Sequence, residues 1–199
     1  YFARPDSTIA NRNVYKVRVE MGRELAREHP IDADLVVPVP DSGNCAALGY
    51  SLESGITYEM AFVRNHYIGR SFLQPAQLIR DFNVRVKLNL IPELVKGKRV
   101  IILDDMIDTA GTMVQAAAAL EAEGATEVIA CCTHAVLSWP AIDRIDGSNL
   151  KEIIVTDSIP LHERAMQCKK KITVLPVAGF LSEAVRRIYH NDSVSSLFI

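Results

Sequence analysis

Residues 98–113 combine a short apolar run, two adjacent carboxylates and a turn of small residues, and this combination constrains the fold most strongly. The apolar residues Val100 to Leu103 predict a strand buried on both faces. Asp104 and Asp105 stand where that strand should end, and an alanine-rich run from Met113 to Ala122 predicts a helix. The turn between them contains Thr109, Ala110, Gly111 and Thr112. A buried strand that leads directly into a helix is typical of an α/β sheet.

The turn at residues 109–112 predicts an anion-binding site. The first N–H groups of a helix are unpaired, and they point at the turn together with the positive end of the helix dipole. Gly111 allows the backbone to approach a ligand closely. Asp104 and Asp105 cannot both be ionised side by side without a compensating partner, and sugar hydroxyls or hydrated Mg²⁺ would serve. The stretch therefore predicts a sugar-phosphate site.

The rest of the chain alternates between the two periodicities. Strands are expected at 35–39, 58–63, 128–132, 152–156 and 171–177, and helices at 14–28, 44–54, 140–145 and 178–190. This alternation predicts an α/β fold in which a mostly parallel, twisted sheet carries helices on both faces. No shift in composition marks a boundary, so we expect a single domain over residues 1–199.

Ligands of such sheets bind at the carboxyl ends of the strands, and several polar clusters are expected at that edge. These clusters are Asp41-Ser42-Gly43, Asp104-Asp105, Thr133-His134 and Asp157-Ser158. The loop from Pro40 to Asn44 again precedes a predicted helix, which makes it a second candidate phosphate loop. Two such loops with an acidic pair between them predict a ligand that carries a monophosphate at one end and a diphosphate at the other.

Residues 64–87 form a long basic segment between two predicted strands. They include Arg64, Arg70, Arg80, Arg85 and Lys87 against the single acid Asp81, with Tyr67, Phe72 and Phe82 interleaved. A segment of this length is more typical of a functional lid than of a connector, with a solvent-exposed hairpin as the alternative.

Charge and composition exclude several classes of protein. The formal net charge is −2, which gives no footprint for nucleic acid, and no apolar run is long enough to cross a membrane. The four cysteines show no metal-ligand spacing, which is typical of buried thiols in a reducing cytoplasm. The N-terminal segment has no signal-peptide pattern, and the missing initial Met suggests a portion of a longer chain. We therefore expect a cytoplasmic protein without nucleic-acid or membrane partners.

Two family resemblances divide the chain. Residues 1–103 resemble the phosphoribosyltransferase domain of glutamine phosphoribosylpyrophosphate (PRPP) amidotransferases, through residues 1–7, 37–43 and 64–75. Residues 104–199 resemble the C-terminal half of ribose-phosphate pyrophosphokinases, which make PRPP, through residues 104–112, 133–138, 155–161 and 193–198. Both families have the type I phosphoribosyltransferase fold. We interpret the chain as an engineered or reconstructed chimera joined within or beside the strand at 100–103.

The resemblance implies a role for each matching residue. It implies that Asp104 and Asp105 meet the ribose hydroxyls and Mg²⁺, with Ser42 as a further metal ligand. The implied substrate-binding residues are Asp108, Thr109, Ala110, Gly111 and Thr112 for the 5-phosphate and Asp41, Ser42 and Gly43 for the pyrophosphate. The pyrophosphate loop of this fold often contains a non-proline cis peptide. Tyr67 and Arg70, as catalytic residues, and Lys87, as a substrate-binding residue, would belong to a lid that closes over PRPP.

The implied activity is Mg²⁺-dependent transfer of the phosphoribosyl group from PRPP to ammonia, with release of pyrophosphate. The glutaminase domain of the amidotransferases is not in this sequence, and neither is the N-terminal half of the pyrophosphokinases, which carries much of their ATP site. A module that binds PRPP, ribose 5-phosphate or phosphate without turnover is therefore an alternative, and residual pyrophosphokinase activity is a third. Both families are oligomeric, so a homodimer is expected.

Overall fold

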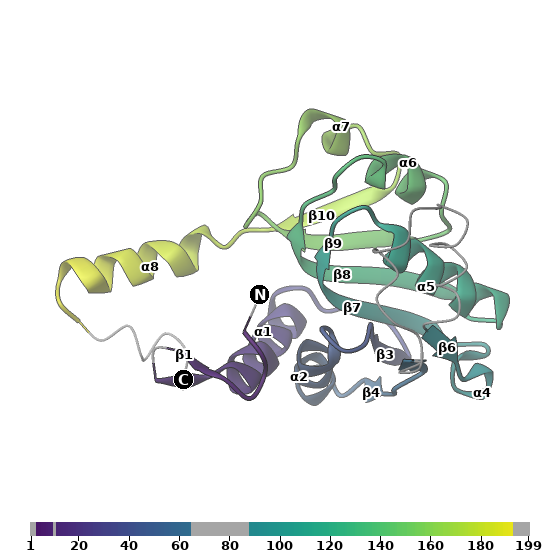
Figure 1. The fold of residues 1–199 in the computed structure, drawn as a ribbon, viewed down its shortest axis with the longest axis horizontal. Helices are drawn as coiled ribbons and strands as arrows, with labels where there is room; N and C mark the ends of the chain where they lie inside the picture. Colours follow the sequence, from purple (N-terminus) through teal and green to yellow (C-terminus); the bar gives the residue numbers. More distant parts are fainter. Residues whose placement is uncertain (1–2, 10, 65–87, 193–199) are drawn as a thin grey trace.

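The central feature of the fold is a six-stranded sheet with the strand order β10-β9-β8-β7-β3-β4 (Figure 1). A computed structural model describes residues 3–9, 11–64 and 88–192. The strands are β3 (Leu35–Pro38), β4 (Thr57–Tyr58), β7 (Arg99–Ile107), β8 (Glu127–Ala135), β9 (Glu152–Thr156) and β10 (Lys171–Leu175). Every neighbouring pair of these strands is parallel. The predicted α/β fold is confirmed.

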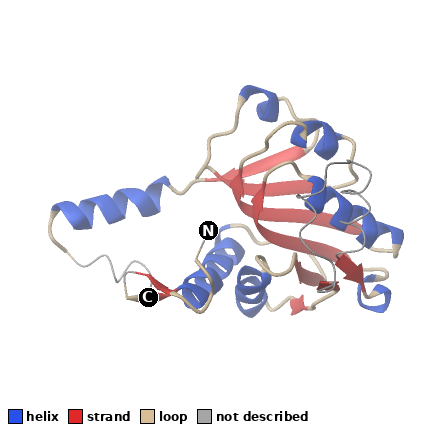
Figure 2. Cartoon of the chain, in the orientation of Figure 1, coloured by secondary structure: helices blue, strands red, loops and turns tan. Residues whose placement is uncertain are grey.

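Helices cover both faces of the sheet (Figures 1 and 2). The helices α1 (Val14–Glu28) and α2 (Asn44–Ser54) pack on one face, and α5 (Gly111–Ala122) and α6 (Ala141–Asp146) pack on the other. Along β7, Val100 and Ile102 point into the core under α5 and α6, while Ile101 and Leu103 point into the core under α1 and α2. The strand is therefore buried on both faces, as its apolar sequence predicts.

The helices α1 and α2 touch through their backbones. A Cβ atom added to Gly22 would lie 1.9 Å from the carbonyl oxygen of Ala46, and one added to Gly49 would lie 1.9 Å from that of Val19. Each glycine therefore leaves room for the neighbouring helix, a close approach that no larger residue permits. Both helices have the predicted limits, and α2 ends at Gly55 in the left-handed conformation.

Three strand predictions need correction. The strand predicted at 58–63 is two separate strands: β4 joins the main sheet, whereas β5 (Phe62–Arg64) pairs antiparallel with β6 (Leu88–Leu90). The chain leaves the main sheet because Ala61 and Phe62 are buried in the core on the α5 side. The strands predicted at 100–103 and 128–132 are also too short, since Ile107 and Ala135 continue the pairing of β7 with β8.

Several short elements were not predicted. They are β1 (Thr8–Ile9), β2 (Arg12–Asn13), β6 (Leu88–Leu90), α4 (Pro92–Val95) and α7 (Glu163–Met166). Each is at most four residues long, and sequence periodicity does not reveal elements of that length.

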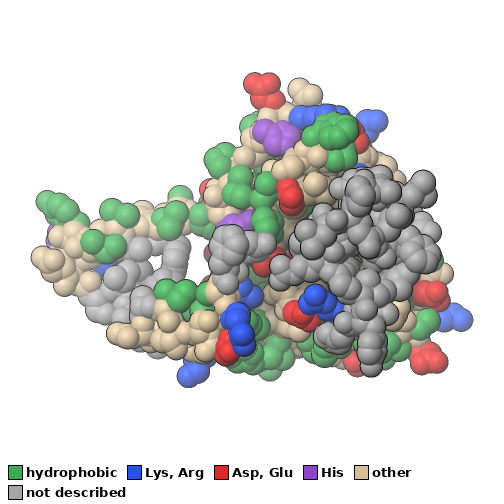
Figure 3. Space-filling view, in the orientation of Figure 1, with side chains coloured by type: hydrophobic (Ala, Val, Ile, Leu, Met, Phe, Trp, Pro, Cys, Tyr) green, Lys and Arg blue, Asp and Glu red, His purple; other side chains and the backbone are tan. Residues whose placement is uncertain are grey.

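The last described helix, α8 (Ala178–Tyr189), projects away from the sheet (Figure 1). Its apolar residues Leu181, Val185 and Ile188 are exposed, and hydrophobic side chains are visible along this projection in Figure 3. Within the described ranges, no helix is both long enough and apolar enough to span a bilayer.

Candidate functional site

The acidic pair lies inside the last part of β7 rather than after it. Asp104 is opposite Cys132 of β8, and the pairing resumes at Met106 without including Asp105. Ser42, in the loop after β3, donates a hydrogen bond of 2.5 Å to Oδ1 of Asp104. The backbone N–H of Asp105 donates to the same oxygen at 2.8 Å. One carboxylate oxygen therefore joins the loop after β3 to the end of β7.

The surroundings of Asp104 favour its neutral form. Burial raises the pKa of Asp104 to about 7, and the charge of Asp105 adds to this increase. The hydrogen bonds from Ser42 and from the Asp105 backbone oppose the shift, because they stabilise the ionised form. Burial, and then the charge of Asp104, raise the pKa of the Cys132 thiol to about 12. The raised pKa values show that the site disfavours further negative charge, and a cation or ligand hydroxyls would stabilise the ionised carboxylates.

The loop at residues 40–43 is held against the end of β7. Val39 N donates to the carbonyl oxygen of Leu103 at 2.8 Å, and a Cβ atom added to Gly43 would lie 2.1 Å from that oxygen. The peptide between Pro40 and Asp41 is cis, as expected for the pyrophosphate loop of this fold. The exposed carboxylate of Asp41 forms an ion pair with Arg64 of β5.

The loop that follows β7 forms the N-terminus of α5. The helix begins at Gly111, two residues before the predicted start, and its cap residue Ala110 has a left-handed backbone with φ of 59°. The Ala110 side chain cannot accept a hydrogen bond, so no cap occupies the N–H groups of the first turn of α5. These N–H groups point at the turn, as the sequence predicts. Ala110 is therefore the left-handed residue of this turn, and Gly111, where the sequence predicts a close approach of the backbone to a ligand, is the first residue of the helix.

The structure brings most of the predicted site residues to one sheet edge. Because β3 and β7 are parallel neighbours, the loops that follow them lie side by side. Ser42 contacts Asp104 directly, and Asp108, Thr109 and Thr112 follow β7 at the same edge with exposed side chains. Tyr67, Arg70 and Lys87 lie outside the described residues.

A hydrogen-bond network extends the edge to β8 and β9. His134 Nδ1 lies 3.0 Å from Ser158 Oγ, and Ser158 Oγ lies 2.8 Å from Thr156 Oγ1. Thr156 Oγ1 also donates to the carbonyl oxygen of Thr133 at 2.8 Å. The two polar clusters predicted after these strands are thereby joined to each other.

One contact at the site was not predicted. Arg144 of α6 donates from Nη1 to the carbonyl oxygen of Thr109 at 2.9 Å. The predicted helix at 140–145 contains Arg144, but only the packing of α6 beside α5 brings it to the loop. The rule that places ligands at the carboxyl ends of strands says nothing about helix residues, so the sequence does not assign Arg144 to the site.

The atoms at the site that could bind a metal ion are oxygen atoms. Asp104, Asp105 and Ser42 offer carboxylate and hydroxyl oxygens, which are the ligands that Mg²⁺ prefers. Among the described residues, no group of three or more His, Cys, Asp or Glu side chains could hold a metal ion by itself. The residues therefore fit a Mg²⁺ ion that takes its remaining ligands from water and substrate, as Mg²⁺ usually does.

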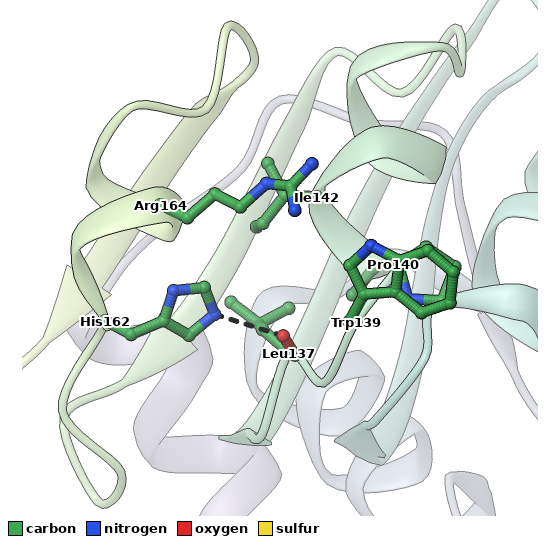
Figure 4. Close-up of a pocket in the computed structure, with 7 residues that line it drawn as sticks. Leu137, Trp139, Pro140, Ile142, His162 and Arg164 are labelled. Atoms are coloured by element: carbon green, nitrogen blue, oxygen red, sulfur yellow. Dashed lines mark hydrogen bonds between the residues drawn. The ribbon is translucent and has the colours of Figure 1, made fainter.

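A separate shallow pocket lies between α6 and α7 (Figure 4). His162, Arg164 and Pro140 line it, and Nε2 of His162 lies 3.1 Å from the carbonyl oxygen of Leu137. Trp139 at its rim is 77% exposed. None of the predicted site residues lines this pocket.

Comparison with known proteins points to two related groups. The sequence pattern of the phosphoribosyl synthetase-associated domain matches residues 71–199. The amidophosphoribosyltransferase of Mycobacterium bovis is 46% identical over 182 residues, which are 92% of this chain and 34% of that protein. The amidophosphoribosyltransferase of Staphylococcus aureus is 42% identical over 91% of this chain and 37% of its own length. The chain thus spans about a third of the length of the curated relatives it matches.

Solved structures give the same two groups. The glutamine PRPP amidotransferase of B. subtilis, complexed with ADP and GMP, is 36% identical with a TM-score of 0.65, over 92% of this chain and 40% of that one. The PRPP synthetase of Mycobacterium smegmatis is 29% identical with a TM-score of 0.64, over 88% of this chain and 51% of that one. The mixed resemblance seen in the sequence is confirmed, and each likeness covers nearly the whole chain.

Proposed function

The chain belongs to the phosphoribosyl synthetase-associated domain family, and from this membership we propose that it is a PRPP-binding phosphoribosyltransferase domain. The observation that carries the proposal is the hydrogen bond between Ser42 and Asp104. It joins the loop assigned to pyrophosphate with the acidic pair assigned to ribose. A single ligand with a phosphate at each end fits that arrangement.

Each part of PRPP has a proposed partner. The N–H groups at the start of α5, with the hydroxyls of Thr109 and Thr112, bind the 5-phosphate. The carboxylates of Asp104 and Asp105 accept hydrogen bonds from the ribose hydroxyls. The loop at residues 40–43 binds the pyrophosphate. Tyr67, Arg70 and Lys87, from the lid predicted at 64–87, are proposed as further partners of PRPP.

Asp104, Asp105 and Ser42 are the proposed Mg²⁺ ligands. The raised pKa of Asp104 supports this assignment, because a half-buried carboxylate beside a second one lacks the positive charge that would keep it ionised. Mg²⁺ bound there would neutralise negative charge on the leaving pyrophosphate.

The proposed reaction needs no nucleophilic side chain. Ammonia forms a bond to C1 of the ribose as the bond from C1 to the pyrophosphate oxygen breaks, and pyrophosphate departs with that electron pair. The protein contributes by holding the ribose with its two carboxylates and by placing both phosphate loops around it.

Replacing Ser42 with alanine tests the contact between the loop at residues 40–43 and Asp104. We expect the variant to bind PRPP with Mg²⁺ about 10-fold more weakly, since it loses a hydrogen bond to a charged group. Calorimetry with PRPP measures the effect, and Ser182→Ala on α8 is the matched control, because Ser182 bonds only within its own helix among the contacts described. Wild-type protein that gives no heat with millimolar PRPP and Mg²⁺ would contradict the proposed function.

Binding of PRPP, ribose 5-phosphate or phosphate without turnover is the second candidate. Release of pyrophosphate from PRPP that depends on ammonium supports the transferase, whereas binding without release supports the silent module. AMP formed from ATP and ribose 5-phosphate would instead reveal pyrophosphokinase activity. The chimeric origin of the chain stays a prediction. The homodimer also stays a prediction, and light scattering would measure the oligomeric state.

A further inference from the structure

We propose that Arg144 is a positioning residue for the 5-phosphate loop, the segment from Asp108 to Thr112. The inference rests on the proposed function, which gives this loop a phosphate ligand. It adds a residue from a different element, α6, that neither the sequence patterns nor the family resemblance assigns to the site.

Two distances place the guanidinium of Arg144 against the loop. Its Nη1 atom donates to the carbonyl oxygen of Thr109 at 2.9 Å. The same atom would lie 3.2 Å from a Cβ atom added to Gly111. The guanidinium therefore lies against the turn formed by these two residues and Ala110, and it occupies space that a side chain at position 111 would need.

The hydrogen bond fixes the orientation of the peptide between Thr109 and Ala110. The C=O and N–H of a trans peptide point in opposite directions. Holding the Thr109 carbonyl toward Arg144 therefore turns the Ala110 N–H away from Arg144. Ala110 is left-handed, and successive N–H groups around a left-handed residue form a concave surface that binds anions. Arg144 thus orients one of the donors of the 5-phosphate loop.

Arg144 also brings a positive charge to the loop, because the carboxylate next to it on its own helix pairs with another residue. The neighbouring carboxylate of Asp143 pairs with Arg164 of α7 at 2.5 Å. Helix α6 is anchored because Ala141, Ile142 and Ile145 are buried in the core shared with α5. A charged donor makes a stronger hydrogen bond than a neutral one, so the loop carbonyl is held firmly.

Replacing Arg144 with methionine keeps the length of the side chain and removes its charge and donors. We expect the dissociation constant for ribose 5-phosphate, measured by calorimetry, to rise about 10-fold, the effect of one hydrogen bond to a charged group. Arg144→Lys keeps the charge, and its dissociation constant for ribose 5-phosphate should lie between those of the wild type and Arg144→Met. The affinity for inorganic pyrophosphate, which is assigned to the other loop, should not change. Arg164→Met is the matched control and should bind ribose 5-phosphate as the wild type does.

A second measurement does not need a ligand. In Arg144→Met without ligand, amide hydrogen exchange at residues 110–112 should accelerate about tenfold, because the peptide loses its anchor. Unchanged exchange overturns the inference, and so does unchanged affinity for ribose 5-phosphate in a wild-type protein that binds it. A wild-type protein that binds neither ribose 5-phosphate nor PRPP refutes the proposed function instead, and exchange then decides the role of Arg144 in ordering the loop.

Discussion

Replacing Asp104 with asparagine is expected to weaken Mg²⁺-dependent binding of PRPP by about 100-fold and, at the same time, to stabilise the folded protein at pH 8. The loss of binding follows because the variant removes a charged partner of both the ribose hydroxyls and the metal, each interaction being worth about 10-fold or more. The amide oxygen of asparagine can still accept the hydrogen bonds from Ser42 and from the Asp105 backbone. The fold around the site should therefore remain.

The gain in stability depends on pH. The pKa of Asp104 is about 7 in the folded protein, and an unfolded chain has an aspartate pKa of about 3.9. Between these values the folded state holds a proton that the unfolded state has released. Asp104 therefore makes unfolding easier as the pH rises from about 4, and this cost is complete above about pH 7. Asparagine carries no charge at any pH and removes the cost.

Urea unfolding across this pH range measures the difference between variant and wild type. The difference in the free energy of unfolding should be small near pH 4 and largest near pH 8. Asp192→Asn, an exposed residue after α8, should show neither the stabilisation nor the loss of binding. An Asp104→Asn protein with unchanged affinity for PRPP would remove Asp104 from the site, and a difference independent of pH would refute the raised pKa.

Replacing Gly49 with alanine is expected to destabilise the protein by about 3 kcal/mol or more. The added Cβ atom would lie 1.9 Å from the backbone oxygen of Val19, and backbone on both sides leaves no flexible side chain to move aside. Both helices also pack on the same face of the sheet, so neither can retreat without opening the core. In an open helix the same change would instead stabilise by about 1 kcal/mol.

Gly179→Ala on α8 is the matched control, because no atom lies within 4 Å of its added Cβ. We expect this variant to be as stable as the wild type or slightly more stable, by about 0.5–1 kcal/mol. Thermal or urea unfolding compares the two variants. Equal stabilities for Gly49→Ala and Gly179→Ala would mean that α1 and α2 are not in backbone contact.

Sequence periodicity identified the elements that pack through regular apolar faces. The limits of α1 and α2 agree with the prediction, since their breakers, His29-Pro30 and Gly55, are local signals. The ends of β7 and β8 were wrong because polar residues stay in the ladder when their neighbours, such as Ile107 and Ala135, are buried. Pairing with another strand is not a local signal.

The candidate site was predictable as far as sheet topology determines it. The rule that ligands lie at the carboxyl ends of parallel strands brings Ser42 and Asp104 to one edge, and the structure places them in contact. The same rule says nothing about Arg144, which reaches the loop from α6. It also does not distinguish Ala110 from Gly111 as the left-handed residue, although glycine adopts that backbone more readily.

The alternation along β7 sets a condition for recombining related chains at this strand. Val100 and Ile102 belong to one layer, and Ile101 and Leu103 to the other. A graft that changed the spacing by one residue would move every side chain of the grafted segment to the opposite face of the sheet. Fragments from two parents can therefore be spliced here only in steps of two residues, and each must match the side-chain volumes of both helical layers at once.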